Sequence, residues 1–157
     1  MSDYFTWLKL IHILGATVLF GTGLGTAFFM WRADRSGDVP AIAVTARHVV
    51  LADFLFTAPA VVAQPVTGVL LAIEAGYGFT EPWLLASIGL YLLVGACWLP
   101  VVRLQLRMRD LAEAARAAGE PLPAAYRRAM RLWFALGWPA FAAILVIFVL
   151  MVFRPSA

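Results

Sequence analysis

The chain has 157 residues, of which 63% are hydrophobic and only 13% charged, with a formal net charge of +3. A soluble globular domain contains about 45–50% apolar and about 25% charged residues. A soluble fold, a disordered chain and a nucleic-acid-binding module are therefore all excluded. The composition predicts a protein whose solvent is lipid, in which an excess of arginine and lysine reports orientation in the membrane.

Four segments are apolar enough to cross a bilayer, which takes about 20 residues each. We expect spans over about residues 7–31, 48–73, 82–103 and 132–153, with a cytoplasmic helical stalk and loop over about 104–131. The pattern predicts a single membrane domain, residues 1–157, with an all-α fold. The four transmembrane helices are expected to form an up-down bundle.

Arginine gathers in the segments that follow the first and third spans. These residues are Arg32, Arg35, Arg47, Arg103, Arg107, Arg109, Arg116, Arg127, Arg128 and Arg131. The other side holds only Lys9 and Arg154. By the positive-inside rule, the arginine-rich side faces the cytoplasm and both termini lie outside. We expect a multi-pass protein of a bacterial inner (cytoplasmic) membrane. Its partners are the lipid bilayer and, as open alternatives, a second copy or another membrane protein, but no nucleic acid.

Glycines cluster in the first span, and Gly21 and Gly25 have the small-xxx-small spacing that lets two helices approach closely. We expect this face to pack against a neighbouring helix. A flat ligand or a second protomer is the alternative.

His12 lies near the outer end of the first span, where an imidazole must find a polar partner. Two interpretations remain open: a hydrogen-bonded structural histidine, or a group that binds haem or a metal ion or carries a proton. Gln64 is expected at a similar depth, so a pocket for a cofactor or substrate, if the protein has one, is expected between the first two spans. Gln64 and Met151 are the nearest donors in depth for a second axial position. His48 is excluded from the same haem, because a rise of 1.5 Å per residue separates the two histidines by about 20–25 Å in depth.

Asp53 is the only acidic residue within the expected spans. A carboxylate at that depth should face the bundle and find a partner. We expect a structural ion pair between Asp53 and an arginine at the inner end of a helix. The candidates are Arg32, Arg103 and Arg131. A proton- or ion-handling carboxylate is the alternative.

The second span also carries Pro59 and Pro65. Each proline removes an amide donor and frees a carbonyl oxygen one turn earlier. The span is therefore expected to be kinked or locally broken, which is tolerated at depth only where protein or water satisfies the freed groups.

Four stretches carry a family resemblance: LKLIHILGATVLFGTGLG, VVLADFLFTAPAVVAQPVTGVLLA, YLLVGACWLPVVRLQ and RLWFALGWPAFAAILVIFVLMVFRP. On these stretches the chain resembles a bacterial family of predicted integral membrane proteins of unknown function, DUF2269. The resemblance implies a topology but no activity.

The opening WLKLIH is also similar to the first helix of HemJ-type protoporphyrinogen oxidases and of CopD-type copper-resistance membrane proteins. In the HemJ type, the histidine matched by His12 is associated with haem, beside a lysine of the third helix. The third span here contains no lysine and no histidine.

The sequence contains no Walker loop, nucleophile elbow, HExxH or CxxC motif. We therefore expect a non-catalytic bundle, an assembly partner or a component of a small-solute or metal permease. The alternative is a b-type haem-binding redox membrane protein with His12 as an axial ligand. Haem b is the cofactor that this alternative implies. The sequence does not decide whether the protein is an enzyme or what its substrate is.

Overall fold

The computed structural model describes residues 3–155, and every regular element in that range is a helix. The elements are α1 (Asp3–Ser36), α2 (Val39–Ala52), the π-helical segment η1 (Asp53–Thr57), α3 (Ala58–Glu74), α4 (Pro82–Ala118) and α5 (Ala124–Phe153). Because α2, η1 and α3 follow one another without a break, the described chain forms four helices long and apolar enough to cross a membrane.

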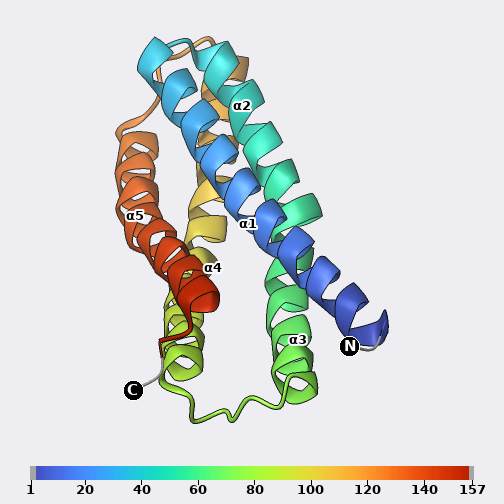
Figure 1. The fold of residues 1–157 in the computed structure, drawn as a ribbon. Coiled ribbons are helices and arrows are strands. Elements are labelled where there is room, and N and C mark those ends of the chain that lie inside the picture. The colour runs from blue at the N-terminus through green and yellow to red at the C-terminus, as the bar shows by residue number, and fades with distance from the viewer. Residues whose placement is uncertain (1–2, 156–157) are drawn as a thin grey trace.

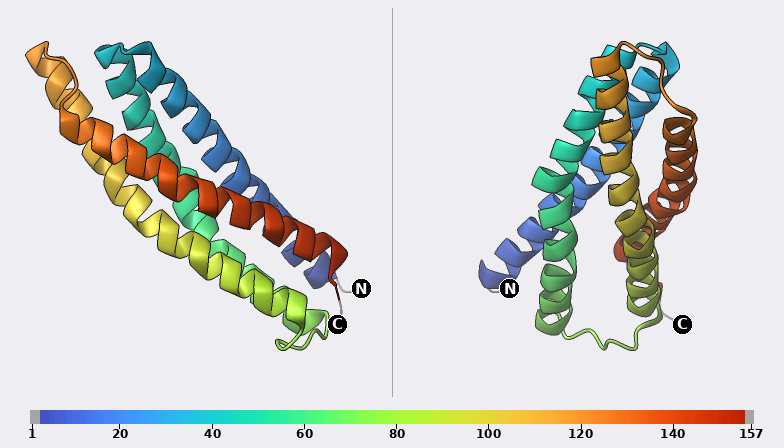
Figure 2. Two further views of the ribbon diagram at one scale, coloured as in Figure 1. Left: turned by 90° about the vertical axis from the view of Figure 1, so that its left-hand side faces the viewer. Right: turned by 180° about the vertical axis from the view of Figure 1, so that it is seen from behind.

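The four long helices run alternately up and down (Figures 1 and 2). The short connections at residues 37–38 and 119–123 lie together at one end of the bundle. The 75–81 loop and both ends of the described chain lie at the other. The all-α, four-helix up-down fold expected from the sequence is therefore confirmed.

The helices extend beyond the apolar segments at the end that carries the arginines. α4 continues to Ala118 and stops at Gly119, whose φ of 67° lies in the left-handed region that favours glycine. The amide of Glu120 then bonds to the carbonyl oxygen of Ala115 at 3.0 Å, which closes the helix end. α2 begins at Val39, well before the span expected from residue 48, so the segment between the first two spans is mostly helix.

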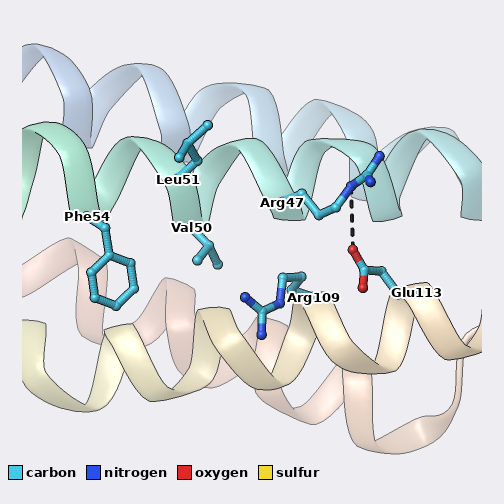
Figure 3. A pocket seen from close by; sticks show the side chains of 6 residues that line it. All are labelled: Arg47, Val50, Leu51, Phe54, Arg109 and Glu113. Atoms are coloured by element: carbon cyan, nitrogen blue, oxygen red, sulfur yellow. Dashed lines mark ion pairs between the residues drawn. The ribbon is translucent and has the colours of Figure 1, made fainter.

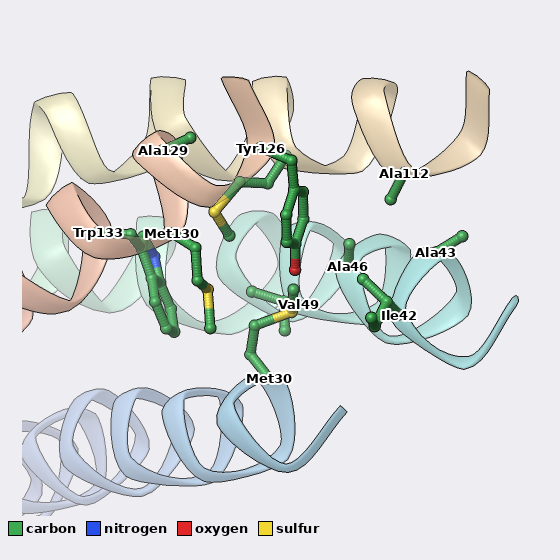
Figure 4. Close-up of a cluster of buried hydrophobic side chains, with 11 residues drawn as sticks. Met30, Ile42, Ala43, Ala46, Val49, Ala112, Tyr126, Ala129, Met130 and Trp133 are labelled. Atoms are coloured by element: carbon green, nitrogen blue, oxygen red, sulfur yellow. The ribbon is translucent and has the colours of Figure 1, made fainter. Parts of the chain in front are cut away.

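A cluster of buried side chains explains this extension, since α1, α2, α4 and α5 all contribute to it (Figure 4). Its members are Met30, Ile42, Ala43, Ala46, Val49, Met108, Ala112, Tyr126, Ala129, Met130 and Trp133. Along the rest of the rods, large apolar side chains point outward, as Leu92 (68% exposed) and Val152 (75% exposed) do. Such surface suits lipid contact.

The helices pack in pairs: α1 lies against α3, α2 against α4, and α4 along α5. At the end opposite the arginines, a smaller cluster joins Ala72 of α3 to Trp83 and Leu84 of α4. Between the two clusters, Phe20 of α1 stacks on Phe141 of α5 with 5.4 Å between ring centroids. The packing of α1 against α3 places the polar residues of α3 next to α1.

Candidate functional site

His12 and Gln64 lie together at the interface of α1 and α3. The Nε2 amide of Gln64 donates to the main-chain carbonyl oxygen of His12 at 2.8 Å. The imidazole Nδ1 of His12 lies 2.8 Å from the hydroxyl Oγ1 of Thr67. The structure thus brings together His12 and Gln64, which the sequence places at a similar depth, and adds Thr67 to them.

Two glycines make room for these polar groups. A Cβ built on Gly15 would overlap the amide nitrogen of Gln64, and one on Gly68 would lie 3.3 Å from the imidazole Cε1 of His12. Each helix therefore presents a glycine opposite the polar side chain of the other. The absence of two side chains lets α1 and α3 approach at this point.

The hydrogen bonds fix the tautomer of His12. The hydroxyl of Thr67 donates to the carbonyl oxygen of Ala63 at 2.7 Å. A hydroxyl has one proton, so Thr67 Oγ1 must accept from His12, and Nδ1 carries the hydrogen. In the neutral imidazole the other nitrogen, Nε2, then has a free lone pair. No described residue bonds to that nitrogen.

The other expected donors make different contacts. The amide of Gln64 is used on the main chain of His12, and Met151 packs on the cluster that contains Trp83. His48 is an exposed residue of α2, 19 positions before Thr67 along one nearly continuous rod. At 1.5 Å per residue, that places it about 28 Å away along the rod. The depth argument against a shared haem therefore agrees with the fold.

The expected packing of Gly21 and Gly25 is not formed in the described chain. A Cβ on either residue, or on Gly23, would meet no atom within 4 Å. The small-xxx-small spacing marks a possible contact face, but α1 turns other residues toward α3. Close packing occurs instead at Gly15 and Gly68, outside that spacing.

Asp53 does not form the expected ion pair. Arg32, Arg103 and Arg131 are exposed, and the ion pairs among residues 3–155 are Arg47–Glu113 and Arg109–Asp110. Asp53 is buried, with 7% of its surface exposed, and its Oδ1 lies 3.4 Å from the indole Nε1 of Trp98 on α4. None of the three arginines lies within ion-pair distance of Asp53, and the indole of Trp98 contacts the carboxylate instead.

The backbone changes its winding where Asp53 lies. In η1 the amide of Ala58 bonds to the carbonyl oxygen of Asp53, five residues earlier, and Pro59 follows with no amide to donate. The expected irregularity of the second span is therefore a π-helical turn. Such turns are frequent at functional sites.

A groove between α2 and α4 lies at the arginine-rich end of this segment (Figure 3). It has a volume of about 360 Å³ and is lined by Arg47, Val50, Leu51, Phe54, Arg109 and Glu113. Across it, Nε of Arg47 lies 3.5 Å from Oε1 of Glu113.

A helical bundle with apolar outer faces and an internal set of hydrogen-bonded polar side chains defines an integral membrane protein. The chain belongs to the family of predicted integral membrane proteins DUF2269, whose model matches residues 6–155. A search of curated proteins and a search of solved structures each returned no match.

The sequence analysis did not predict the residues that contact His12 and Asp53. Thr67 and Gly68 share a helix face with Gln64 by their spacing of three and four, so this signal was present in the sequence. The role of Trp98 had no such signal, because it depends on which face of α4 turns toward η1.

Proposed function

We propose that the chain is a membrane protein that binds haem b through His12. The observation that carries the proposal is the bond from Nδ1–H of His12 to Thr67, which leaves Nε2 free. Histidines that ligate metals almost always donate their other ring N–H to a neighbouring oxygen, which fixes the ring and its tautomer. The resemblance of the first helix to HemJ-type proteins also supports His12 as the haem ligand.

The donor set fits haem better than a bare metal ion. Among residues 3–155, no group of three His, Cys, Asp or Glu side chains gathers to hold an ion. A haem brings its own four nitrogen ligands and needs only an axial one, which His12 supplies. When bound, haem provides one-electron transfer. The side chain of Thr67 orients the imidazole, and Gly68 leaves space beside it.

We also propose an orientation of the bundle in the membrane. The arginine-rich end, at residues 37–38 and 119–123, faces the cytoplasm of a bacterial inner membrane. His12 then lies toward the outer side. The gathering of the arginines at one end of the bundle supports this orientation.

The test is the absorption spectrum of the protein purified in mild detergent after expression with ample haem. A Soret band and a pyridine-haemochrome signature are expected. With one axial histidine, the ferric form should be high-spin and the reduced form should bind carbon monoxide. His12→Ala should lose the haem, and His48→Ala, a change at an exposed position, should retain it.

Circular dichroism of His12→Ala separates loss of a ligand from loss of the fold. A folded variant without haem supports the proposal. Haem lost by His48→Ala but kept by His12→Ala would contradict it, and so would a wild-type chain that binds no haem. That last result would return His12 to a structural role in a non-catalytic bundle.

A further inference from the structure

Asp53 is the one acidic or basic side chain that the described structure buries. Its Oδ2 has no hydrogen-bond partner, and neither has the buried Oγ1 of Thr57 in the same π-helical segment. Oδ1 has only the long contact from Trp98. Two oxygen atoms without hydrogen-bond partners therefore lie within one helical turn. Burying such groups without a partner costs free energy.

No opposite charge compensates the carboxylate. η1 packs against α1, α2 and α3, and Trp98 reaches it from α4. The charged and titratable residues of α1, α2 and α4 toward the arginine-rich end form no ion pair or hydrogen bond with Asp53. They are Arg32, Asp34, Arg35, Arg47, His48, Arg103, Arg107, Arg109, Asp110 and Glu113. A buried carboxylate without a counter-ion is stabilised by gaining a proton, because neutralisation removes most of the desolvation cost.

The groove between α2 and α4 reaches the π-helical segment at Phe54, next to Asp53 in the chain. Its lining begins at Arg47 and Glu113 and ends at Phe54, the residue that follows Asp53 (Figure 3). The contact between Asp53 and Trp98 joins the same two rods, α2–η1 and α4. The groove therefore lies between the arginine-rich end and the segment that carries Asp53.

We propose that Asp53 is a reversible proton-binding site, supplied from the arginine-rich end of the bundle through this groove. The proton neutralises the carboxylate and turns one of its oxygens into a donor beside the hydroxyl of Thr57. The π-helical turn lets this segment adjust when the proton is gained or lost.

The test uses dicyclohexylcarbodiimide, an apolar reagent that adds to protonated carboxyl groups, on the full chain in mild detergent. Peptide mass spectrometry locates the adduct over a pH series. Labelling of Asp53 should be strongest at acidic pH and should fall severalfold as the pH is raised. Asp53→Asn should lose the adduct. Trp98→Phe, which removes the indole donor, should keep its adduct to higher pH than wild type.

Access is measured separately by infrared spectroscopy after a jump to alkaline pH. The carboxylic C=O band assigned by Asp53→Asn should disappear several-fold more slowly in Leu51→Trp, which enlarges one of the side chains that line the groove, with the same final extent. An equal rate would contradict the groove as the route.

Three results on the wild-type chain would overturn the proposal whether or not the variants fold. They are no adduct on Asp53 at acidic pH, an adduct that does not depend on pH, and an adduct suppressed by sodium at fixed pH. Suppression by sodium would assign the site to a metal cation instead of a proton.

Discussion

The hydroxyl of Tyr91 on α4 donates to the main-chain carbonyl oxygen of Val61 on α3. This is the carbonyl that Pro65 leaves free, because a proline has no amide to bond four residues back. A side chain of a neighbouring helix thus replaces the missing backbone donor. In lipid, no water is available to take that place.

Tyr91→Phe should therefore destabilise the bundle by about 1–3 kcal/mol, the cost of leaving a buried acceptor unsatisfied. The free energy of unfolding in detergent measures it. Tyr4→Phe, at a position 52% exposed, is the control and should change little.

Tyr91→Phe in a Pro65→Ala background shows whether the proline is the reason that Val61 needs the hydroxyl of Tyr91. Alanine restores the amide that bonds to Val61, so Tyr91→Phe should then cost less than in the wild type. Equal costs in both backgrounds would show that the bond to Val61 does not depend on Pro65.

Gly15→Ala should destabilise the α1–α3 interface by about 1–2 kcal/mol. The added methyl group would overlap the amide of Gln64 and push it away from the carbonyl oxygen of His12. Gly21→Ala is the matched control on the same helix, because its methyl group meets no atom within 4 Å. It should be neutral or stabilising by up to about 1 kcal/mol, since alanine favours a helix. A similar loss in both variants would contradict the close approach at Gly15.

Thr67→Val should weaken haem binding by about 10–100-fold, the usual effect of removing a residue that orients a metal ligand. Valine keeps the shape of threonine but cannot accept from Nδ1–H of His12. Haem titration into the purified chain measures the change. Thr17→Val, whose hydroxyl bonds only to its own helix, is the control. If both variants bind haem as wild type does, Thr67 has no orienting role.

The sequence predicts much of this arrangement because a bilayer imposes strong rules. Long charge-free segments must be helices, and the depth of a residue follows from its position along a span. That reasoning placed His12 and Gln64 at one level, where the structure joins them. It also predicted an irregular second span from Pro59 and Pro65.

The rotation of each helix about its axis is what the sequence does not determine. The sequence predicts that Asp53 pairs with an arginine at an inner helix end, yet Arg32, Arg103 and Arg131 are exposed and Trp98 contacts the carboxylate. Gly21 and Gly25 have a recognised spacing, yet α1 presents Gly15 to α3. Both outcomes depend on packing among all the helices, which no single span encodes.

Asp53→Asn should keep the stability of the wild type within about 1 kcal/mol, because the wild-type side chain has no ion-pair partner to lose. An ion-paired carboxylate would instead cost about 3–5 kcal/mol on removal. Unfolding in detergent distinguishes the two values. Arg103→Gln, at an exposed position, is the companion variant and should also change little. A large loss of stability in both variants would indicate that Asp53 and Arg103 form an ion pair after all.

The arginine-rich end should face the cytoplasm, and this orientation is testable in living bacteria. A reporter active only in the periplasm should give signal when fused at Gly78, in the loop at the opposite end, and after Arg154, where α5 has ended. Fused at Glu120, in the turn between α4 and α5, it should be silent. A reporter active only in the cytoplasm, at the same three positions, should give the complementary pattern. Translocating the arginines of α4 and α5 would oppose the positive-inside rule. Signal from the periplasmic reporter at Glu120 alone would therefore reverse the proposed orientation, and with it the outer position of His12.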